Sequence, residues 1–265
     1  MKQIPSQANT GHRARKRFGQ NFLINENVIQ NIIRAISTKP GDHIVEIGPG
    51  LGVLTEQLLA TRAEVTAVEL DRDLITQLEK KFPESINLNL INADALTLNY
   101  AEVHTDKIRV VGNLPYNIST PILFRLLESS SQIQDMHFML QKEVVNRLAA
   151  QPGTSAWGRL GIMIQYHCQV DNLFDVPPES FDPPPKVDSA VVRLTPQAPK
   201  TKVTSLDRLE KVVRIAFNKR RKTLRNALKD LYTEQQIREL DIDPSLRPEN
   251  LNLEQYISLA NQPHD

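Results

Sequence analysis

The residues with the clearest chemical potential lie in the segment Val110–Thr120, which reads VVGNLPYNIST. Asn113 offers a side-chain oxygen, and Leu114 offers a backbone carbonyl that Pro115 helps to orient. Tyr116 adds a ring on which a nucleobase could stack. The exocyclic amine of adenine is a poor nucleophile, and two acceptors outside the ring plane would favour the tetrahedral geometry that it needs for attack. The segment therefore suits methyl transfer to such an amine by proximity and oriented dipoles. The alternative is a plain turn, because these residues favour turns.

A glycine-rich loop lies earlier in the chain, in the stretch HIVEIGPGLGVLTEQLL, which reads as strand, loop and helix. Gly48, Gly50 and Gly52 leave the turn without side chains, so a ligand can approach the backbone. The helix that follows offers free N–H groups at its start. The spacing is G-x-G-x-G rather than the dinucleotide-binding G-x-G-x-x-G. This spacing disfavours a dehydrogenase, and hydride transfer has no evident need for the NLPY segment.

Two acids follow the next two predicted strands. Glu69 lies 21 residues after Gly48, about where doubly wound folds place the carboxylate that binds a ribose diol. Asp94 is again an acid at the carboxyl end of a strand, the edge where ligands of open α/β sheets collect. An adenosine-bearing cofactor would place its ribose at Glu69 and its base amine near Asp94. The alternatives are that Glu69 starts the next helix with Asp71 and that Asp94 caps a helix.

Short β-rich runs alternate with helical patterns over the first three-quarters of the chain, which predicts a parallel sheet covered on both faces. The predicted strands are His43–Ile47, Glu64–Val68, Leu88–Ile91, Ile108–Val111, Met136–Leu140, Ile162–Gln169 and Ala190–Leu194. Helical patterns lie at Asn27–Ile36, Leu51–Leu59, Asp73–Lys80, Pro121–Leu127 and Val144–Ala149. The last two strands lack a helix between them, so we expect an antiparallel pair at one edge.

The connection between those last two strands, VPPESFDPPPKVDS, contains five prolines and is predicted to be loop. Its Phe181 precedes three prolines that would keep the loop stiff. We interpret Phe181 as a partner of Tyr116, with the two rings clamping a flipped base. The alternative is an apolar plug under the loop.

A Pro/Ser/Thr/Lys-rich linker after Leu194 separates the sheet region from a purely helical tail. We predict one domain over residues 1–198 and a second, helical and RNA-binding, over residues 199–265. The predicted helices of the tail are Leu206–Phe217, Lys222–Leu231, Thr233–Leu240 and Leu253–Asn261, with Ser205 and Thr233 as N-caps.

Basic residues are concentrated in the tail, although the net charge of the whole chain is only +1. Residues 202–230 hold ten Lys and Arg and three acids. Such segregation suggests a polyanionic partner, and the alternative is a solvated helix face. The stretch FNKRRKTLRNAL gathers the residues that we expect to contact RNA phosphates, namely Lys219, Arg220, Arg221, Lys222 and Arg225.

The composition of the chain narrows the classes of protein to which it can belong. The hydrophobic fraction of 40% supports a sizeable core, and no apolar run is long enough for a bilayer span, so we expect no membrane contact. The basic N-terminus lacks the apolar core of a secretory signal, although a transit peptide is an alternative. The single cysteine, Cys168, excludes an intramolecular disulfide and a cysteine-based zinc site. We expect a cytoplasmic monomer without a metal.

Seven segments in order along the chain carry a resemblance to a known family: RKRFGQNFL, VEIGPGLGVLT, VELDRD, GNLPYNISTPI, MLQKEVVNRL, PPPKVDSAVVRL and AFNKRRKTLRN. From about Gly11 to Ala260 the chain resembles the bacterial small-subunit (16S) rRNA adenine N6,N6-dimethyltransferases. The resemblance implies an α/β fold: a Rossmann-like class I methyltransferase domain, with a mostly parallel seven-stranded sheet, and a small all-helical C-terminal domain.

The resemblance also implies an activity. The family transfers four methyl groups from S-adenosylmethionine to two adjacent adenosines in the helix-45 loop of 16S rRNA, in the small ribosomal subunit or its precursor, and takes part in small-subunit biogenesis. The implied cofactor contacts are Asn21, Leu23, Gly48, Glu69, Asp94 and Asn113. The implied target-base residues are Asn113, Leu114, Tyr116 and Phe181. Asn21 and Leu23 carry no signal of their own, since RKRFGQNFL otherwise reads as a basic arm before a helix.

Two other functions remain as alternatives. One is an adenine methylase of 23S rRNA, as in the macrolide-resistance relatives, which FGQNFL and NKRRKT disfavour. The other is a non-catalytic ribosome-assembly or transcription factor that keeps the fold, which the intact NLPY segment disfavours.

Overall fold

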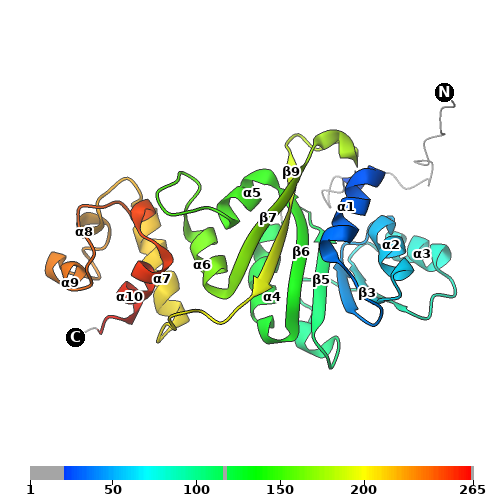
Figure 1. Ribbon diagram of the computed structural model, residues 1–265, viewed down its shortest axis with the longest axis horizontal. Coiled ribbons are helices and arrows are strands. Elements are labelled where there is room, and N and C mark those ends of the chain that lie inside the picture. The colour runs from blue at the N-terminus through cyan, green and yellow to red at the C-terminus, as the bar shows by residue number, and fades with distance from the viewer. Residues whose placement is uncertain (1–20, 116–117, 264–265) are drawn as a thin grey trace.

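A computed structural model describes residues 21–115 and 118–263 of the chain. Its centre is a seven-stranded sheet in the order β4-β3-β2-β5-β6-β9-β7 (Figure 1). The first five of these strands pair in parallel, and β9 pairs antiparallel with both β6 and β7. The strands are β2 (His43–Ile47), β3 (Glu64–Glu69), β4 (Leu88–Asn92), β5 (Ile108–Asn113), β6 (Ile133–Gln141), β7 (Cys168–Val176) and β9 (Ser189–Pro196).

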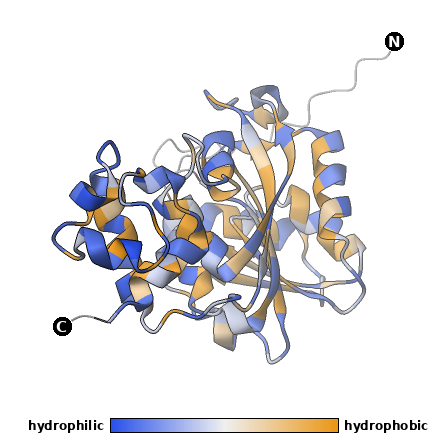
Figure 2. Ribbon diagram, turned by 60° about the vertical axis from the view of Figure 1, so that its left-hand side comes forward, coloured by the Kyte–Doolittle hydropathy of each residue, from blue (hydrophilic) through white to orange (hydrophobic). Residues whose placement is uncertain are grey.

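Helices cover both faces of this sheet. Buried residues of α1 (Glu26–Ile36) and α2 (Val53–Ala60) pack with Val111 and Met139 on one face. On the other face, α4 (Ser119–Leu127) and α5 (Lys142–Leu148) pack with Val110 and Phe138. Adjacent strand residues thus point into different cores, as the two-residue period requires. Figure 2 shows the central strands as mostly hydrophobic and the surrounding helices as mixed. The helix α3 (Arg72–Lys81) follows β3 and starts at Asp71, whose side chain accepts the Asp73 N–H.

A third core lies at the carboxyl-terminal end of the molecule. It joins α6 (Arg159–His167) to α7 (Leu206–Asn218), α8 (Leu224–Ala227), α9 (Glu234–Arg238) and α10 (Leu253–Asn261). Ser205 and Thr233 cap α7 and α9 through their side chains, which confirms both predicted N-caps. Short 3-10 helices are η2 (Tyr100–Glu102), η3 (Ser130–Gln132), η4 (Pro178–Ser180) and η5 (Pro248–Asn250).

The predicted strand Ile162–Gln169 is wrong. Most of that run belongs to the helix α6, and β7 begins only at Cys168. Leu160 to Ile164 are all buried, because α6 lies between the sheet and the C-terminal helices. A helix that is buried all round has no polar face, so its sequence cannot be distinguished from that of a buried strand. An antiparallel pair does lie at this edge of the sheet, as predicted, but β9 pairs there with β7 and not with the predicted strand Ile162–Gln169.

Two further predictions need correction. The proline-rich connection is not all loop, because η4 and the two-residue strand β8 (Phe181–Asp182) lie within it. The predicted helix Lys222–Leu231 shrinks to α8, because residues 219–223 form a turn after α7. A helix through this segment would place Lys219 beside Lys222 and Arg221 beside Arg225, and like charges three or four positions apart on a helix repel.

A small two-stranded sheet lies outside the main one. Its strands are β1 (Phe22–Leu23) and β8, which pair antiparallel with Leu23 opposite Phe181. This pairing ties the residues just before α1 to the proline-rich connection 158 positions later in the chain. Within the described ranges, no helix combines the length and apolar character that a bilayer crossing needs.

Candidate active site

A cavity of about 200 Å³ opens at the carboxyl ends of β2, β3, β4 and β5. Parallel strands present their carboxyl ends at one edge, which is where ligands of open α/β sheets bind. Eight residues that the sequence singled out line this one cavity, namely Asn21, Leu23, Gly48, Glu69, Asp94, Asn113, Leu114 and Phe181. Tyr116 lies outside the described residues.

The glycine loop forms the floor of the cavity between β2 and α2. Gly48, Gly50 and Gly52 all have positive φ angles, of 68°, 57° and 74°. Residues with a Cβ rarely adopt this conformation, so glycine is required by the turn itself. A Cβ on Gly50 would also come within 3.3 Å of the Phe22 ring, so the loop and β1 are in close contact.

Glu69 ends β3 and turns its carboxylate back onto the loop. One oxygen accepts the Asp71 N–H at 2.9 Å, and the other accepts the Gly50 N–H at 3.4 Å. The side chain is nearly buried, and this burial raises the pKa of its carboxyl group. Asp71, not Glu69, caps α3. Glu69 is therefore free of helix capping and fixed at the cavity.

A second buried carboxylate was missed by the sequence analysis. Glu46 lies in β2, lines the cavity and is 1% exposed. Its oxygen accepts a hydrogen bond from the Thr55 hydroxyl at 2.6 Å. Burial raises the pKa of Glu46 to about 7, with a smaller contribution from the charge of Glu69. An acid inside the apolar run HIVEI was the available signal, since acids are almost never fully buried without a partner.

Asp94 follows β4 and forms a local turn rather than an α-helix N-cap. Its side-chain Oδ1 accepts the Leu96 N–H at 2.9 Å, and its backbone carbonyl accepts the Thr97 N–H at 2.9 Å. Around it the cavity wall is apolar and includes Leu70 and Leu96. A carboxylate beside apolar walls is the arrangement that a flat base with one amino edge requires.

Asn113 ends β5 at the mouth of the cavity. Its amide nitrogen donates to the Asn21 carbonyl at 3.1 Å, which leaves the amide oxygen as the acceptor for a ligand. Leu114 is 1% exposed, and its N–H donates to the Met139 carbonyl at 3.2 Å. A Cβ on Gly112 would lie 2.5 Å from the Ile47 carbonyl, so β5 needs a glycine to approach β2.

Phe181 is 3% exposed and belongs to the same buried cluster as Leu23 and Val28. Its ring also lines the cavity, so a base would meet it only from inside. The position of Phe181 therefore agrees with an apolar plug under the loop. Contact with a base that enters the cavity is a second possible role of the same ring.

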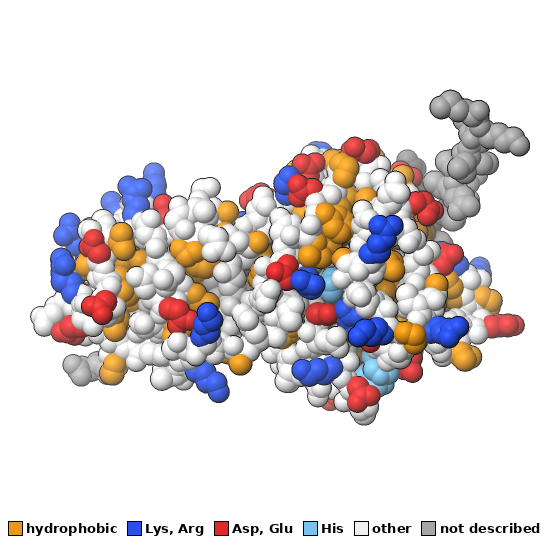
Figure 3. All heavy atoms as spheres, in the orientation of Figure 1, with side chains coloured by type: hydrophobic (Ala, Val, Ile, Leu, Met, Phe, Trp, Pro, Cys, Tyr) orange, Lys and Arg blue, Asp and Glu red, His pale blue; other side chains and the backbone are white. Residues whose placement is uncertain are grey.

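The five basic residues of the tail lie away from the cavity, around the turn between α7 and α8. Lys219 pairs with Asp230 at 3.1 Å, and Arg225 lies 3.8 Å from Glu234. Arg220 donates to Glu249 at 2.6 Å and to the Ser155 carbonyl at 2.8 Å, so it also holds the fold. Arg221 and Lys222 are exposed. Figure 3 shows Lys and Arg side chains gathered at the end of the molecule that carries α8 and α9.

Comparison with known proteins identifies the family to which this chain belongs. Residues 11–264 match the family model described as ribosomal RNA adenine dimethylase. The chain belongs to this family. A relative from Pseudomonas aeruginosa named "Ribosomal RNA small subunit methyltransferase A" is 56% identical over 95% of this chain and 95% of its own. A relative of the same name from Hahella chejuensis is 54% identical over 97% of this chain and 95% of its own.

Solved structures agree with the family. A dimethyladenosine transferase from Plasmodium falciparum has a TM-score of 0.78 and 28% identity over 90% of this chain and 95% of that one. The 23S rRNA methyltransferase ErmE has a TM-score of 0.74 and 28% identity over 91% of this chain and 98% of that one. The chain has the Rossmann-like class I methyltransferase fold predicted from the resemblance. It is an rRNA adenine dimethyltransferase, and its cofactor is S-adenosylmethionine.

The cavity fits this cofactor by the chemistry of its lining. A ribose diol needs acceptors, which the Glu69 carboxylate supplies, and an adenine needs apolar faces with one polar edge, which Leu70, Leu96 and Asp94 supply. Gly48 keeps the floor free of a side chain next to Asn113, whose backbone carbonyl would lie 3.9 Å from a Cβ at that position.

Proposed function

We propose that this chain dimethylates the N6 amines of two adjacent adenosines in the helix-45 loop of 16S rRNA, within the small ribosomal subunit or its precursor, and so takes part in small-subunit biogenesis. The observation that carries the choice of subunit is the shared name of the curated relatives, which cover nearly the whole chain. We further propose that it acts as a monomer in the cytoplasm.

In this proposal the cavity binds the cofactor through residues from each strand end. Glu69 accepts from the ribose hydroxyls, Asp94 accepts from the base amine, and Gly48 lets the backbone approach. Asn21 and Leu23 close the cavity from the side of β1, where the Asn113–Asn21 hydrogen bond and the β1–β8 pairing hold them. When bound, S-adenosylmethionine supplies an electrophilic methyl group on a sulfonium.

The target adenine enters beside Asn113 and Leu114. The Asn113 amide oxygen and the Leu114 carbonyl accept the two N–H groups of the amine and draw its lone pair out of conjugation with the ring. Because the amide nitrogen of Asn113 is already committed to Asn21, its oxygen has a fixed direction. Tyr116 stacks on the base, and Phe181 meets it from within the cavity. No strong base is needed before transfer, since the amine loses its proton after the methyl group has arrived.

The helical tail supplies affinity for RNA rather than choice of base. Lys219, Arg220, Arg221, Lys222 and Arg225 contact phosphates, and phosphate contacts carry little sequence information. Because the tail is proposed to bind RNA and the sheet region to bind the cofactor, we propose two functional domains. Residues 1–198 form a methyltransferase domain with its N-terminal arm, and residues 199–265 form an RNA-binding domain. The folded rRNA itself then provides the selection of the two adenosines.

A direct test is transfer of radiolabelled methyl groups from S-adenosylmethionine to unmethylated small subunits, naked 16S rRNA and 23S rRNA in parallel. We expect four methyl groups per small subunit, which mass spectrometry of nuclease fragments would map to the two adjacent adenosines. The second candidate is methylation of 23S rRNA, which the structural similarity to ErmE favours. Label found only in 23S rRNA would replace the first proposal with the second.

A further inference from the structure

Two histidines and a glutamate meet at the edge of the sheet opposite the cavity. His43 is the first residue of β2, and Glu64 is the first residue of β3 and its partner in the parallel register. His104 lies in the segment between η2 and β5, four residues before Ile108, which is the β5 partner of His43. The pairing of β2 with β3 and β5 therefore brings the backbone positions of these three residues close together.

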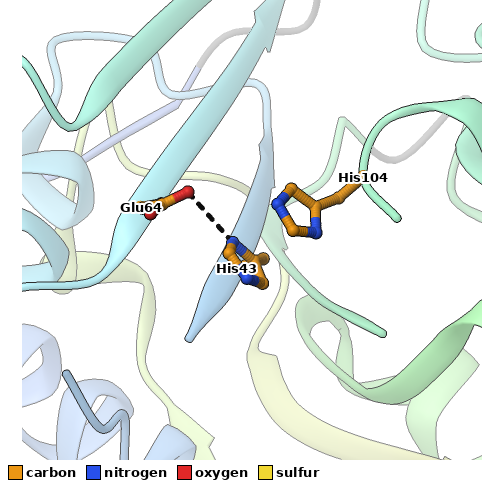
Figure 4. Close-up of side chains that lie close together, drawn as sticks. All are labelled: His43, Glu64 and His104. Carbon is orange, nitrogen blue, oxygen red and sulfur yellow. Dashed lines mark ion pairs between the residues drawn. The ribbon is translucent and has the colours of Figure 1, made fainter. Parts of the chain in front are cut away.

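Their donor atoms lie close together. Nδ1 of His43 lies 3.1 Å from Oε2 of Glu64, and one ligand atom from each of His43, Glu64 and His104 lies within 4.8 Å of the others (Figure 4). The rings of His43 and His104 are stacked, with centroids 3.4 Å apart and 21° between the planes. Nδ1 of His43 is shielded from solvent, yet it hydrogen bonds to none of the described residues. The contact with Glu64 is thus close without being a hydrogen bond.

Carboxylates lie on both sides of the His43 ring. Oε2 of Glu64 lies 3.1 Å from Nδ1, and Oδ2 of Asp106 lies 3.7 Å from Nε2. An imidazole nitrogen and a carboxylate oxygen that lie this close without a hydrogen bond between them can both donate a lone pair to one cation.

The 3.1 Å between Nδ1 of His43 and Oε2 of Glu64 suits two ligands of one metal ion. Ligands of a tetrahedral zinc ion, each at about 2.0–2.1 Å, lie roughly 3.3 Å from one another. Asp106 would then be the outer carboxylate that orients a metal-bound histidine. Two imidazoles and one carboxylate are a ligand set that Zn²⁺ accepts, whereas Mg²⁺ and Ca²⁺ prefer oxygen ligands. We propose that His43, Glu64 and His104 form a Zn²⁺ site on the surface of the protein, opposite the cofactor cavity.

Metal binding at this site has a cost. Nδ1 of His104 accepts the Asp106 N–H at 3.0 Å. A metal at either nitrogen of His104 ends this hydrogen bond, because it takes the Nδ1 lone pair or shifts the ring proton onto Nδ1. His104 must also turn out of the stack, since the in-plane lone pairs of parallel rings do not converge. We therefore expect weaker binding than at the buried zinc sites that hold small domains together.

The test uses untagged full-length protein, dialysed against ZnCl₂ and analysed for bound metal. We expect one saturable Zn²⁺ per chain in the wild type. Glu64→Gln and His104→Asn should each weaken binding at least tenfold. Matched controls are Glu102→Gln, an exposed acid close in sequence to His104, and His167→Asn, a histidine outside the cluster; both should bind as the wild type does.

Cobalt gives a second readout, because Co²⁺ bound to histidine nitrogen in a four-coordinate site shows strong visible absorption. This spectrum should appear with the wild type and be lost in His104→Asn. Wild-type protein that takes up no stoichiometric zinc, or a His104→Asn variant that keeps wild-type affinity, would overturn the proposal. Glu64 is 59% exposed in its side chain, so Glu64→Gln should fold and answers the question even if the histidine variant does not. Methyl transfer by the metal-free protein should be unchanged, which separates this inference from the proposed function.

Discussion

At the scale of single residues, Asn113 combines a structural and a chemical function. Its amide nitrogen holds the Asn21 carbonyl, and its oxygen is the acceptor proposed for the adenine amine. The first transfer offers two N–H groups to Asn113 and the Leu114 carbonyl, but the monomethylated amine offers only one. The second transfer must therefore proceed with one acceptor unpaired.

We predict that Asn113→Ala slows both transfers, by on the order of 10²–10³ if its oxygen acts like one group of a preorganised polar site. Time-resolved mass spectrometry of mono- and dimethylated product measures each step. Asn89→Ala, an exposed asparagine of β4 outside the cavity, is the matched control and should keep both rates. Rates near those of the wild type in Asn113→Ala would refute the role assigned to this side chain.

Glu46 allows a prediction on pH dependence. Burial raises its pKa from 4.5 to about 7 in the folded chain, so the folded state binds more protons than the unfolded state between these values. Stability should therefore fall as pH rises through this window, and the full penalty is present above pH 7. A difference of this size corresponds to about 3 kcal/mol.

Glu46→Gln removes the titrating group and still accepts the Thr55 hydroxyl hydrogen bond. We expect the variant to gain stability relative to the wild type between pH 4 and pH 8, by up to about 3 kcal/mol. Urea unfolding without cofactor at several pH values measures this gain. Glu102→Gln, at an exposed position, should show none of this pH dependence. A constant difference between Glu46→Gln and the wild type across the range would contradict the argument.

Some of the residues that line the cavity could be predicted from the sequence, and others could not. Glu69 and Asp94 were predictable because each follows a strand whose end the topology must bring to the ligand edge. Asn21 and Leu23 were accessible only through resemblance to the family, since their position depends on the pairing of β1 with β8, and two-residue strands have no periodicity. Glu46 was missed because it lies inside the apolar run HIVEI and not at the carboxyl end of a strand, where ligand-binding acids of open α/β sheets are expected.

At the scale of elements, the turn between α7 and α8 holds both cations that we propose to bind RNA and a cation that holds the fold. Arg220 is tied to Glu249 and to the Ser155 carbonyl, whereas Arg221 and Lys222 are exposed. Replacement of all three cations would therefore mix loss of stability with loss of affinity. The pair Arg221 and Lys222 isolates the RNA contact.

We predict that the double variant Arg221→Gln/Lys222→Gln binds small subunits more weakly and with a salt slope smaller by about 1–2, because each phosphate contact adds nearly one unit to that slope. Filter binding over a series of KCl concentrations measures it. Arg34→Gln/Lys39→Gln, two exposed cations beside α1, is the control and should keep the slope. An unchanged slope in the Arg221/Lys222 variant would remove this turn from the RNA interface.

The parallel strands were predicted to within a few residues because their apolar runs are short and flanked by turn signals. The error at α6 has the opposite origin, since this helix is enclosed by two cores and shows no amphipathic period. The sequence of α6 alone could not reveal that enclosure, because the first of the C-terminal helices that complete it, α7, begins 39 residues after α6 ends.

At the scale of the whole molecule, the functional division at residue 198 does not coincide with the packing. Trp157, Ile162 and Met163 precede that position, yet they are buried against α7 and α10 in the third core. Nε1 of Trp157 also donates to the Leu251 carbonyl at 2.8 Å. The sheet-side segment around α6 is thus held between the main sheet and the helical tail.

A fragment of residues 1–198 should therefore be less stable than the full chain. Exposing Trp157, Ile162 and Met163 costs about 1.5–3 kcal/mol for each side chain and leaves an apolar surface that promotes association. We expect a lower melting temperature by circular dichroism, strong binding of a hydrophobic dye, and early proteolysis near α6. Full-length Trp157→Phe, which loses the hydrogen bond to Leu251 and part of one buried ring but keeps the rest of the third core, should stay folded and bind little dye. A fragment that melts with the full chain and binds no dye would show that the tail is a separate folding unit, and the third core would then contribute little to the stability of the sheet domain.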